Sequence, residues 1–183
     1  MWKRFSSVSV VVVLACGLAS CNNAANNAAA PVPEAEQVVS AALKNLYMAA
    51  SAAPPHSAEQ QKIILQMAAQ ASNGKELLLV MRAAVGVFPP SSNSQEVDAE
   101  SRVCSLVTAK MIQVGTLDQL IEYASQYSVD PADARRVIQR MFQLGGDSTD
   151  PRVWYRIKTA AYHLQVSDLE VRARTRAEQL AGR

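Results

Sequence analysis

The side chains best suited to catalysis or metal binding are few in this 183-residue chain, and their spacing keeps them apart. The two histidines are His56, directly after a Pro-Pro pair, and His163, near the end of an expected helix, where a cation complements the helix dipole. Zinc sites need three or four His, Cys or carboxylate ligands held close together. Neither histidine has such a cluster around it in the sequence. We therefore expect two unrelated structural histidines, no metal site and no cofactor.

Motifs of common catalytic sites are also absent: the chain contains no G-x-S-x-G, no H-E-x-x-H and no glycine-rich phosphate loop. Cys104 lies in helical spacing with Val107 and Met111, which favours a buried, inert thiol; the alternative is a disulfide between two chains. We expect a protein that is not an enzyme and has no small-molecule substrate. A hydrolase that uses His56 or His163 is the least favoured reading.

The charges are balanced, with 18 basic and 16 acidic residues, which argues against a nucleic-acid partner. Residues 102–183 carry a small basic excess, 12 against 9. Two arginine pairs lie one helical turn apart: Arg136 with Arg140, and Arg172 with Arg176. Such pairs could face an acidic partner or membrane phosphates. Because Glu170, Arg174 and Glu178 follow one another at the same spacing, the last helix partly neutralises itself, and a solvated surface is the favoured reading.

Apolar residues recur with helical periodicity from residue 34 onward, and no segment after the first 20 residues alternates as a strand would for more than four residues. The pattern predicts an all-α fold of about eight short antiparallel helices. The expected helices span residues 34–52, 58–72, 75–87, 95–114, 117–127, 131–144 and 151–164, with a last one that follows Ser167 and carries Leu169 to Leu180. Seven of the eight aromatic residues after the first 20 positions lie at 88 or later, so we expect the main core at about 94–183.

Helix boundaries carry recognisable signals. A Ser or Thr followed three residues later by Gln or Glu is typical of a capping box. Three such pairs occur: Ser57 with Gln60, Thr116 with Gln119, and Ser167 with Glu170. Pro131 and Pro151 suit first helical positions. Gly74, Gly115 and Gly145 each follow an apolar run, where a left-handed residue would end a helix.

A weak internal repeat links two of these helices. Asp130-Pro131 and Asp150-Pro151 open similar segments, and Thr116 lies 34 residues before Asp150. That spacing is typical of tetratricopeptide helix pairs, but the Trp, Leu-Gly and Tyr positions that are diagnostic of the family are absent. The helices could therefore form a closed bundle or an open, repeat-like array.

The N-terminus has the form of an export signal: Lys3 and Arg4 precede an apolar run from Val8 to Ala19 that is too short to span a bilayer. The run ends in Leu18-Ala19-Ser20-Cys21, which resembles the lipobox of bacterial lipoproteins. The resemblance implies cleavage before Cys21, a diacylglyceryl group on its sulfur and an acyl chain on its amino group. Cys16 fits the pattern less well, and the alternative is an ordinary signal peptide cleaved near Ala19 or Ser20.

We therefore divide the chain into a signal peptide at 1–20, a lipidated Cys21 with a flexible tether at 21–33, and a helical domain at 34–183. The tether is rich in Asn and Ala and lacks the apolar surface to fold. By resemblance to enteric lipoproteins, Asn22 in place of Asp favours the periplasmic face of the outer membrane over the inner membrane.

An anchor, a tether and a helical body without catalytic motifs favour a protein that binds another protein of the cell envelope. One such role is pilotin-like, in which a small lipoprotein escorts a subunit of a secretion machine to the outer membrane. The alternative is a scaffold lipoprotein whose helical repeats assemble envelope complexes.

Overall fold

The computed structural model describes residues 37–85, 87 and 94–182, and it confirms the all-α fold. Over these ranges the chain forms helices and no strands. The helices are α1 (Ala41–Ala52), α2 (Ala58–Gln70), α3 (Gly74–Val85), α4 (Ser94–Val114), α5 (Leu117–Gln126), α6 (Pro131–Gly145), α7 (Pro151–His163) and α8 (Ser167–Ala181). The signal peptide, Cys21 and the tether at 21–33 lie outside the described residues. None of the described helices has the length and hydropathy needed to cross a bilayer.

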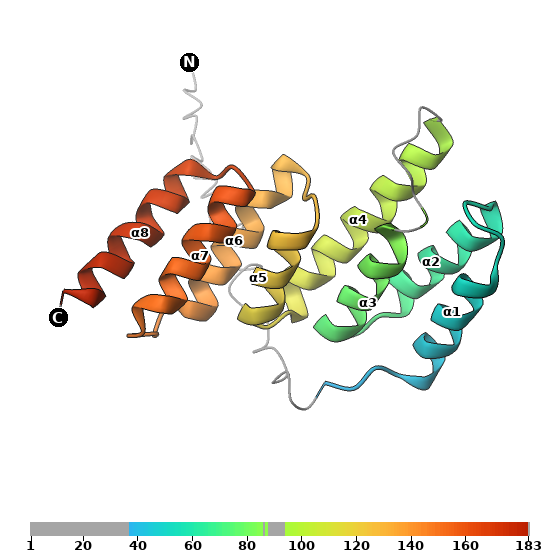
Figure 1. The fold of residues 1–183 in the computed structure, drawn as a ribbon, viewed down its shortest axis with the longest axis horizontal. Helices are drawn as coiled ribbons and strands as arrows, with labels where there is room; N and C mark the ends of the chain where they lie inside the picture. The colour runs from blue at the N-terminus through green and yellow to red at the C-terminus, as the bar shows by residue number, and fades with distance from the viewer. Residues whose placement is uncertain (1–36, 86, 88–93, 183) are drawn as a thin grey trace, which may run out of the picture.

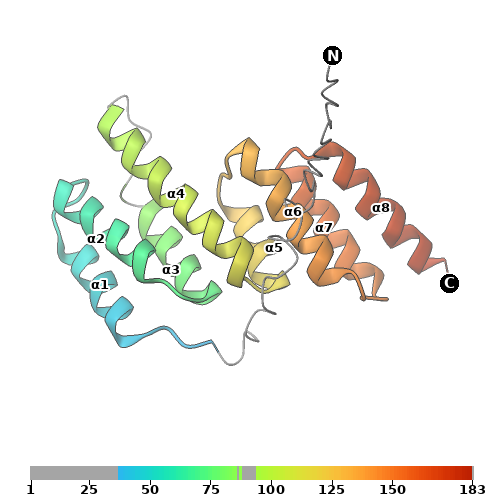
Figure 2. The ribbon, with the colours of Figure 1, turned by 180° about the vertical axis from the view of Figure 1, so that it is seen from behind.

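The helices form an open, two-layer array rather than a closed bundle. Every extensive contact joins a helix to the next helix in the chain or to the one after it. The odd-numbered helices lie nearer the viewer in Figure 1, and α2, α4 and α6 lie nearer the viewer from behind in Figure 2. The even-numbered helices begin at residues 58, 94, 131 and 167, a spacing of 36, 37 and 36 residues. This regular spacing and the nearest-neighbour contacts are features of helical-repeat proteins.

One continuous core runs between the two layers. Its buried side chains come from all eight helices, and α2 and α3 contribute fully buried residues such as Ile64, Met67 and Val80. The expected concentration of the core at 94–183 was therefore too narrow. Aromatic residues led to that expectation, whereas α1 to α3 fill their share of the core with Leu, Ile, Met and Ala.

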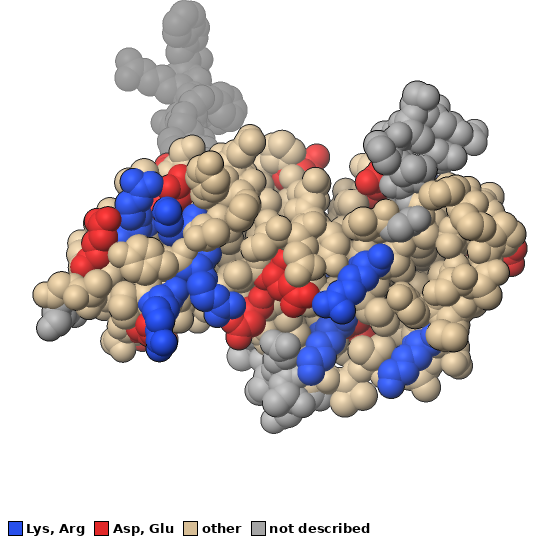
Figure 3. Space-filling model, in the orientation of Figure 1, with Lys and Arg blue, Asp and Glu red and all other residues tan. Residues whose placement is uncertain are grey.

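Ion pairs link successive helices on the exposed face of the odd-numbered layer. Arg82 of α3 lies 2.9 Å from Glu122 of α5, and Asp118 of α5 lies 2.6 Å from Arg156 of α7. Figure 3 shows the result: basic side chains over α3 and α7 flank acidic ones over α5. These pairs are exposed, so each contributes little free energy, but they neutralise this face.

The predicted helix caps have mixed outcomes. Thr116 and Gln119 form the complete capping box at the start of α5. Ser57 accepts a hydrogen bond from the Gln60 backbone, but the Gln60 side chain binds the backbones of Ala50 and His56 instead of closing the box. The prediction of a third capping box, Ser167 with Glu170, was wrong. Ser167 is the first residue inside α8, with no side-chain cap before it.

The first helix also begins later than expected, because Ser40 caps it at residue 41. Residues 37–40 form an extended segment that lies against the N-terminal ends of α3 and α5. The side chain of Gln37 accepts hydrogen bonds from the backbone of Lys75 and from Nε2 of Gln119. The chain therefore enters the array near its middle, and α1 follows from there.

Gly115 and Gly145 lie at the ends of α4 and α6 as predicted, but neither has the predicted left-handed conformation. None of the described glycines has a positive φ, whereas two other described residues, His56 and Gln165, do. Gly74 is the first residue of α3, and a Cβ there would lie 1.8 Å from Oε1 of Gln119. Gly74 is therefore required for the close approach of α3 and α5, rather than for a left-handed turn.

Candidate functional site

A hollow at the surface opens where the second layer is incomplete. α2 packs on α4, and α4 on α6, but α8 is absent from the extensive contacts of α6. Figure 2 shows α7 between the two helices. The gap forms a groove of about 980 Å³, here called the α6–α8 groove. Its walls and floor come from α6, α7 and α8.

Aromatic rings and arginines dominate the α6–α8 groove. Phe142 of α6 and Trp154 of α7 meet edge to face, with ring centroids 5.3 Å apart. Arg172 of α8 lies over the Phe142 ring at 5.2 Å, and Arg176 lies over the Trp154 ring at 5.9 Å. Nε1 of Trp154 donates to the carbonyl of Ser148, so the buried indole has its one polar group satisfied. Packing thus fixes the rings, and the rings in turn position the guanidinium groups.

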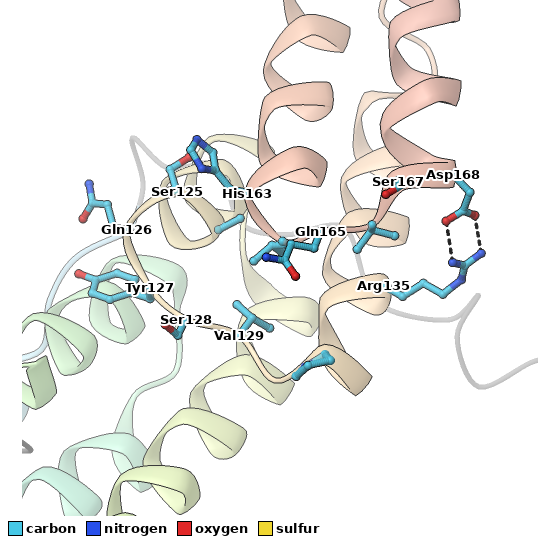
Figure 4. Close-up of a pocket in the computed structure, with 14 residues that line it drawn as sticks. Ser125, Gln126, Tyr127, Ser128, Val129, Arg135, His163, Gln165, Ser167 and Asp168 are labelled. Atoms are coloured by element: carbon cyan, nitrogen blue, oxygen red, sulfur yellow. Dashed lines mark hydrogen bonds and ion pairs between the residues drawn. The ribbon is translucent and has the colours of Figure 1, made fainter. Parts of the chain in front are cut away.

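A second hollow of about 750 Å³ adjoins the groove at the N-terminal ends of α6 and α8. Figure 4 shows its lining, which comes from the α5–α6 loop and the α7–α8 turn. Arg135 and Asp168 line both hollows and separate them. The Arg135 guanidinium donates two hydrogen bonds to the Asp168 carboxylate, at 2.9 and 2.6 Å. The two hollows therefore form one long depression divided by a bidentate ion pair.

Some charged side chains of the groove have an ion-pair partner and others do not. Hydrogen bonds from Arg135 lower the pKa of Asp168, so this carboxylate stays ionised and committed to its partner. Among the described residues, Arg172 and Arg176 have neither a carboxylate partner nor a side-chain hydrogen bond. On the same helix, Arg174 is paired with Glu170. The groove thus presents two cations that no described residue neutralises.

The other arginine pair does not form a site. Arg136 is exposed and binds Asp133 at 2.7 Å, one turn earlier on the same helix. Arg140 is buried and donates from Nη1 to the Gln143 side chain, while its Nε and Nη2 have no partner among the described residues. The two arginines therefore do not present one basic face.

The two histidines lie in different parts of the array and do not meet. His56 occupies the turn between α1 and α2, where its Nδ1 lies 3.0 Å from the carbonyl oxygen of Val87. His163 lines the second hollow, as does Ser125, whose hydroxyl donates to the carbonyl of Ile121. Over the described residues, no group of three or more His, Cys, Asp or Glu is placed to hold a metal ion.

Cys104 is half-buried rather than fully buried, and it is a free thiol. Burial, with a smaller contribution from the charge of Glu100, raises the pKa of the thiol. A raised pKa keeps the sulfur protonated and slow to react. The expectation of an unreactive thiol therefore has a physical basis in its surroundings.

Sequence reasoning noticed the spacing of Arg172 and Arg176 but favoured a solvated surface. It missed the role of Phe142 and Trp154, because only the packing of three helices brings these rings under the arginines. No local pattern marks such a site in advance.

Neither the family models nor the curated proteins nor the solved structures contain a match to this chain. The groove must therefore be interpreted from its own chemistry.

Proposed function

We propose that this protein is a lipid-anchored module of the bacterial cell envelope that binds another protein through its helical array. The observation that carries the proposal is the open two-layer architecture with its long depression across α6, α7 and α8. Open arrays of this kind bind by extended surfaces, and grooves between helices accept segments of partner proteins. Under this proposal the protein is not an enzyme.

The lipobox-like sequence supplies the anchor in this proposal. Two or three acyl chains on Cys21 would hold the protein stably at a membrane, since each buried CH₂ contributes about 0.8 kcal/mol. We place it at the periplasmic face of the outer membrane because Asn22, and not Asp, follows the cysteine.

Two roles fit such a module. The first is escort, as in a pilotin-like accessory that brings a secretion subunit to the outer membrane. The second is a scaffold that holds several envelope proteins together. The open array favours the scaffold role more than a closed bundle would, because its surface offers several binding faces at once.

The anchor is tested by replacing Cys21. We expect Cys21→Ala to lose metabolic labelling with palmitate and to leave the membrane fraction, because the proposed acceptor for the lipid is gone. Cys16→Ala is the matched control, since it removes the other cysteine of the same region and should keep label and location. Full labelling of the Cys21→Ala variant would overturn the anchor.

The binding role is tested by cross-linking in membranes followed by purification of the full chain. A scaffold predicts several envelope proteins in fixed stoichiometry. An escort predicts one partner, whose arrival at the outer membrane fails in the Cys21→Ala strain. Recovery of the chain without a stoichiometric partner would overturn the proposed function.

A further inference from the structure

We infer that the α6–α8 groove binds an acidic segment of the partner protein, with carboxylates one helical turn apart that pair with Arg172 and Arg176. This inference rests on the proposed protein-binding function and names the chemistry of the partner. The remaining polar lining of the groove, including Gln139, Gln143 and Gln179, supplies amides that can bind a peptide backbone.

The charges that line the groove indicate that the partner segment is negatively charged. Three guanidinium groups line the groove, and its one carboxylate, Asp168, is held by Arg135. Two cations remain for a ligand. An arginine that is free of other partners can form a bidentate pair with a carboxylate, which is stronger than a neutral hydrogen bond.

The spacing of the cations gives the partner its pattern. Arg172 and Arg176 are four residues apart on α8, so their side chains leave the helix on one face, about 5–6 Å apart at their Cβ atoms. Two Glu residues at the same spacing on a partner helix would match them. Because the rings of Phe142 and Trp154 already hold the arginines, little side-chain entropy is lost on binding.

Nucleic acid and membrane fit the groove less well. Bases bind proteins by stacking on exposed aromatic faces. Here arginines lie over both rings, and Trp154 is only 4% exposed. A lipid surface is flat, whereas the arginines lie in a hollow between two helices. A narrow protein segment is the occupant that reaches both cations.

The test uses the full chain in detergent micelles and a synthetic helical peptide of about 15 residues that carries Glu at two positions four apart. A matched peptide has Gln at both positions. Binding is measured by the anisotropy of a dye on the peptide. Trp154 fluorescence reports whether the groove is occupied, because the proposed cleavage before Cys21 removes Trp2 and leaves Trp154 as the single tryptophan.

We expect the Glu peptide to bind and to change Trp154 fluorescence, and the Gln peptide to bind at least about tenfold more weakly, as the loss of charge-assisted hydrogen bonds implies. The Arg172→Gln/Arg176→Gln variant should lose affinity by a similar factor. Arg174→Gln is the matched control: it removes one charge from the same helix, outside the groove, and should change affinity less than about twofold.

Equal peptide binding by the double variant and the wild-type chain would overturn the inference. So would equal losses in the double variant and Arg174→Gln, or stronger Arg172- and Arg176-dependent binding to phosphatidylglycerol vesicles or oligo-dT than to the Glu peptide. If circular dichroism shows that the double variant is unfolded, the Arg172→Lys/Arg176→Lys variant is used in its place. That variant keeps the charge, loses the planar fork and should bind the Glu peptide several-fold more weakly. Unchanged binding by the lysine variant would overturn the inference.

The inference and the proposed function can fail separately. If the double variant still recovers the membrane partner in full, the groove is not the site, but protein binding stands. If the wild-type chain recovers no partner in membranes, the proposed function fails.

Discussion

One buried side chain with several hydrogen bonds is a carboxylate. Glu76 is 1% exposed at the start of α3. Its Oε1 accepts the backbone N–H of Ser40 at 2.9 Å, and its Oε2 accepts the backbone and hydroxyl groups of Ser72 at 2.8 and 2.9 Å. Glu76 therefore ties the segment before α1 to the junction between α2 and α3.

These hydrogen bonds decide the ionisation of Glu76. Burial alone would raise its pKa, but the donors from Ser40 and Ser72 outweigh burial, and the pKa in the folded protein is lowered from about 4.5. A lowered pKa means that the stabilisation is complete above the pKa of the unfolded chain. It is lost as the pH falls through the lower value in the folded chain.

We expect Glu76→Gln to reduce the free energy of unfolding at neutral pH by about 1.5–3 kcal/mol, because an amide presents an NH₂ group where the carboxylate accepted hydrogen bonds. The difference from wild type should shrink as the pH falls from about 4.5 through the lower pKa of folded Glu76, because first the unfolded and then the folded wild-type chain takes up a proton there. Urea unfolding at a series of pH values measures both effects. Glu178→Gln, at an exposed position on α8, should change stability by less than about 0.5 kcal/mol, and equal losses in the two variants would contradict this account.

Gly74 shows the limit of prediction at the scale of single residues. The sequence places it after an apolar run, and that position suggested a helix end. Its role comes from Gln119, 45 positions later, whose side chain occupies the space a Cβ would need. Local rules cannot anticipate a requirement set by a residue on another helix.

At the scale of elements, helix ends are satisfied both locally and from a distance. The Thr116–Gln119 box could be predicted, because both partners lie within one turn. The cap at the C-terminal end of α2 could not be predicted from the sequence. Lys110, far away on α4, donates from Nζ to the carbonyls of Ala68, Ala69 and Ala71, at 2.9, 2.6 and 2.9 Å.

We expect Lys110→Met to lower the free energy of unfolding by about 1–3 kcal/mol. Methionine keeps much of the apolar stem, but the carbonyls at the end of α2 lose their charged donor. Lys62→Met is the matched control, because Lys62 is an exposed lysine on α2 itself. Its effect should stay within about 0.5 kcal/mol, and chemical denaturation of both variants checks the comparison. A Lys110 variant as stable as the Lys62 variant would show that α2 does not depend on this cap.

At the scale of the whole molecule, the all-α class and the number of helices in the described part of the chain could be predicted, but the arrangement of these helices could not. The sequence left a closed bundle and an open array as alternatives. Unequal spacing hides the repeat in the sequence. α5 and α7 begin 34 residues apart, whereas α3 and α5 begin 43 residues apart, because the 21-residue helix α4 lies between them. The groove is likewise a property of the array, since it exists only where α8 fails to pack on α6.

An open array predicts that stability is local. We expect Leu43→Ala in α1 to increase hydrogen exchange in α1 and α2 strongly, because removing a fully buried leucine side chain costs about 2–5 kcal/mol. Exchange in α7 and α8 should remain near wild type, because these helices have no extensive contact with α1. Exchange measured by mass spectrometry distinguishes the regions.

Ile157→Ala in α7 is the reciprocal variant, and it should affect α5 to α8 while sparing α1 and α2. Uniform loss of protection across all helices in both variants would indicate a single cooperative unit and contradict the local model.

The attachment of Gln37 between Lys75 and Gln119 has a mechanical consequence if Cys21 carries the lipid. A pull on the membrane anchor would reach the folded body at this clasp, at the N-terminal ends of α3 and α5. The tension would therefore enter near the midpoint of the array and load α1 and α3 first. α7 and α8, with the groove between α6 and α8, lie on the far side of this attachment point and would carry little of the tension. Movement of a partner bound in the groove would then leave the contacts of Gln37, and the anchor beyond it, unchanged.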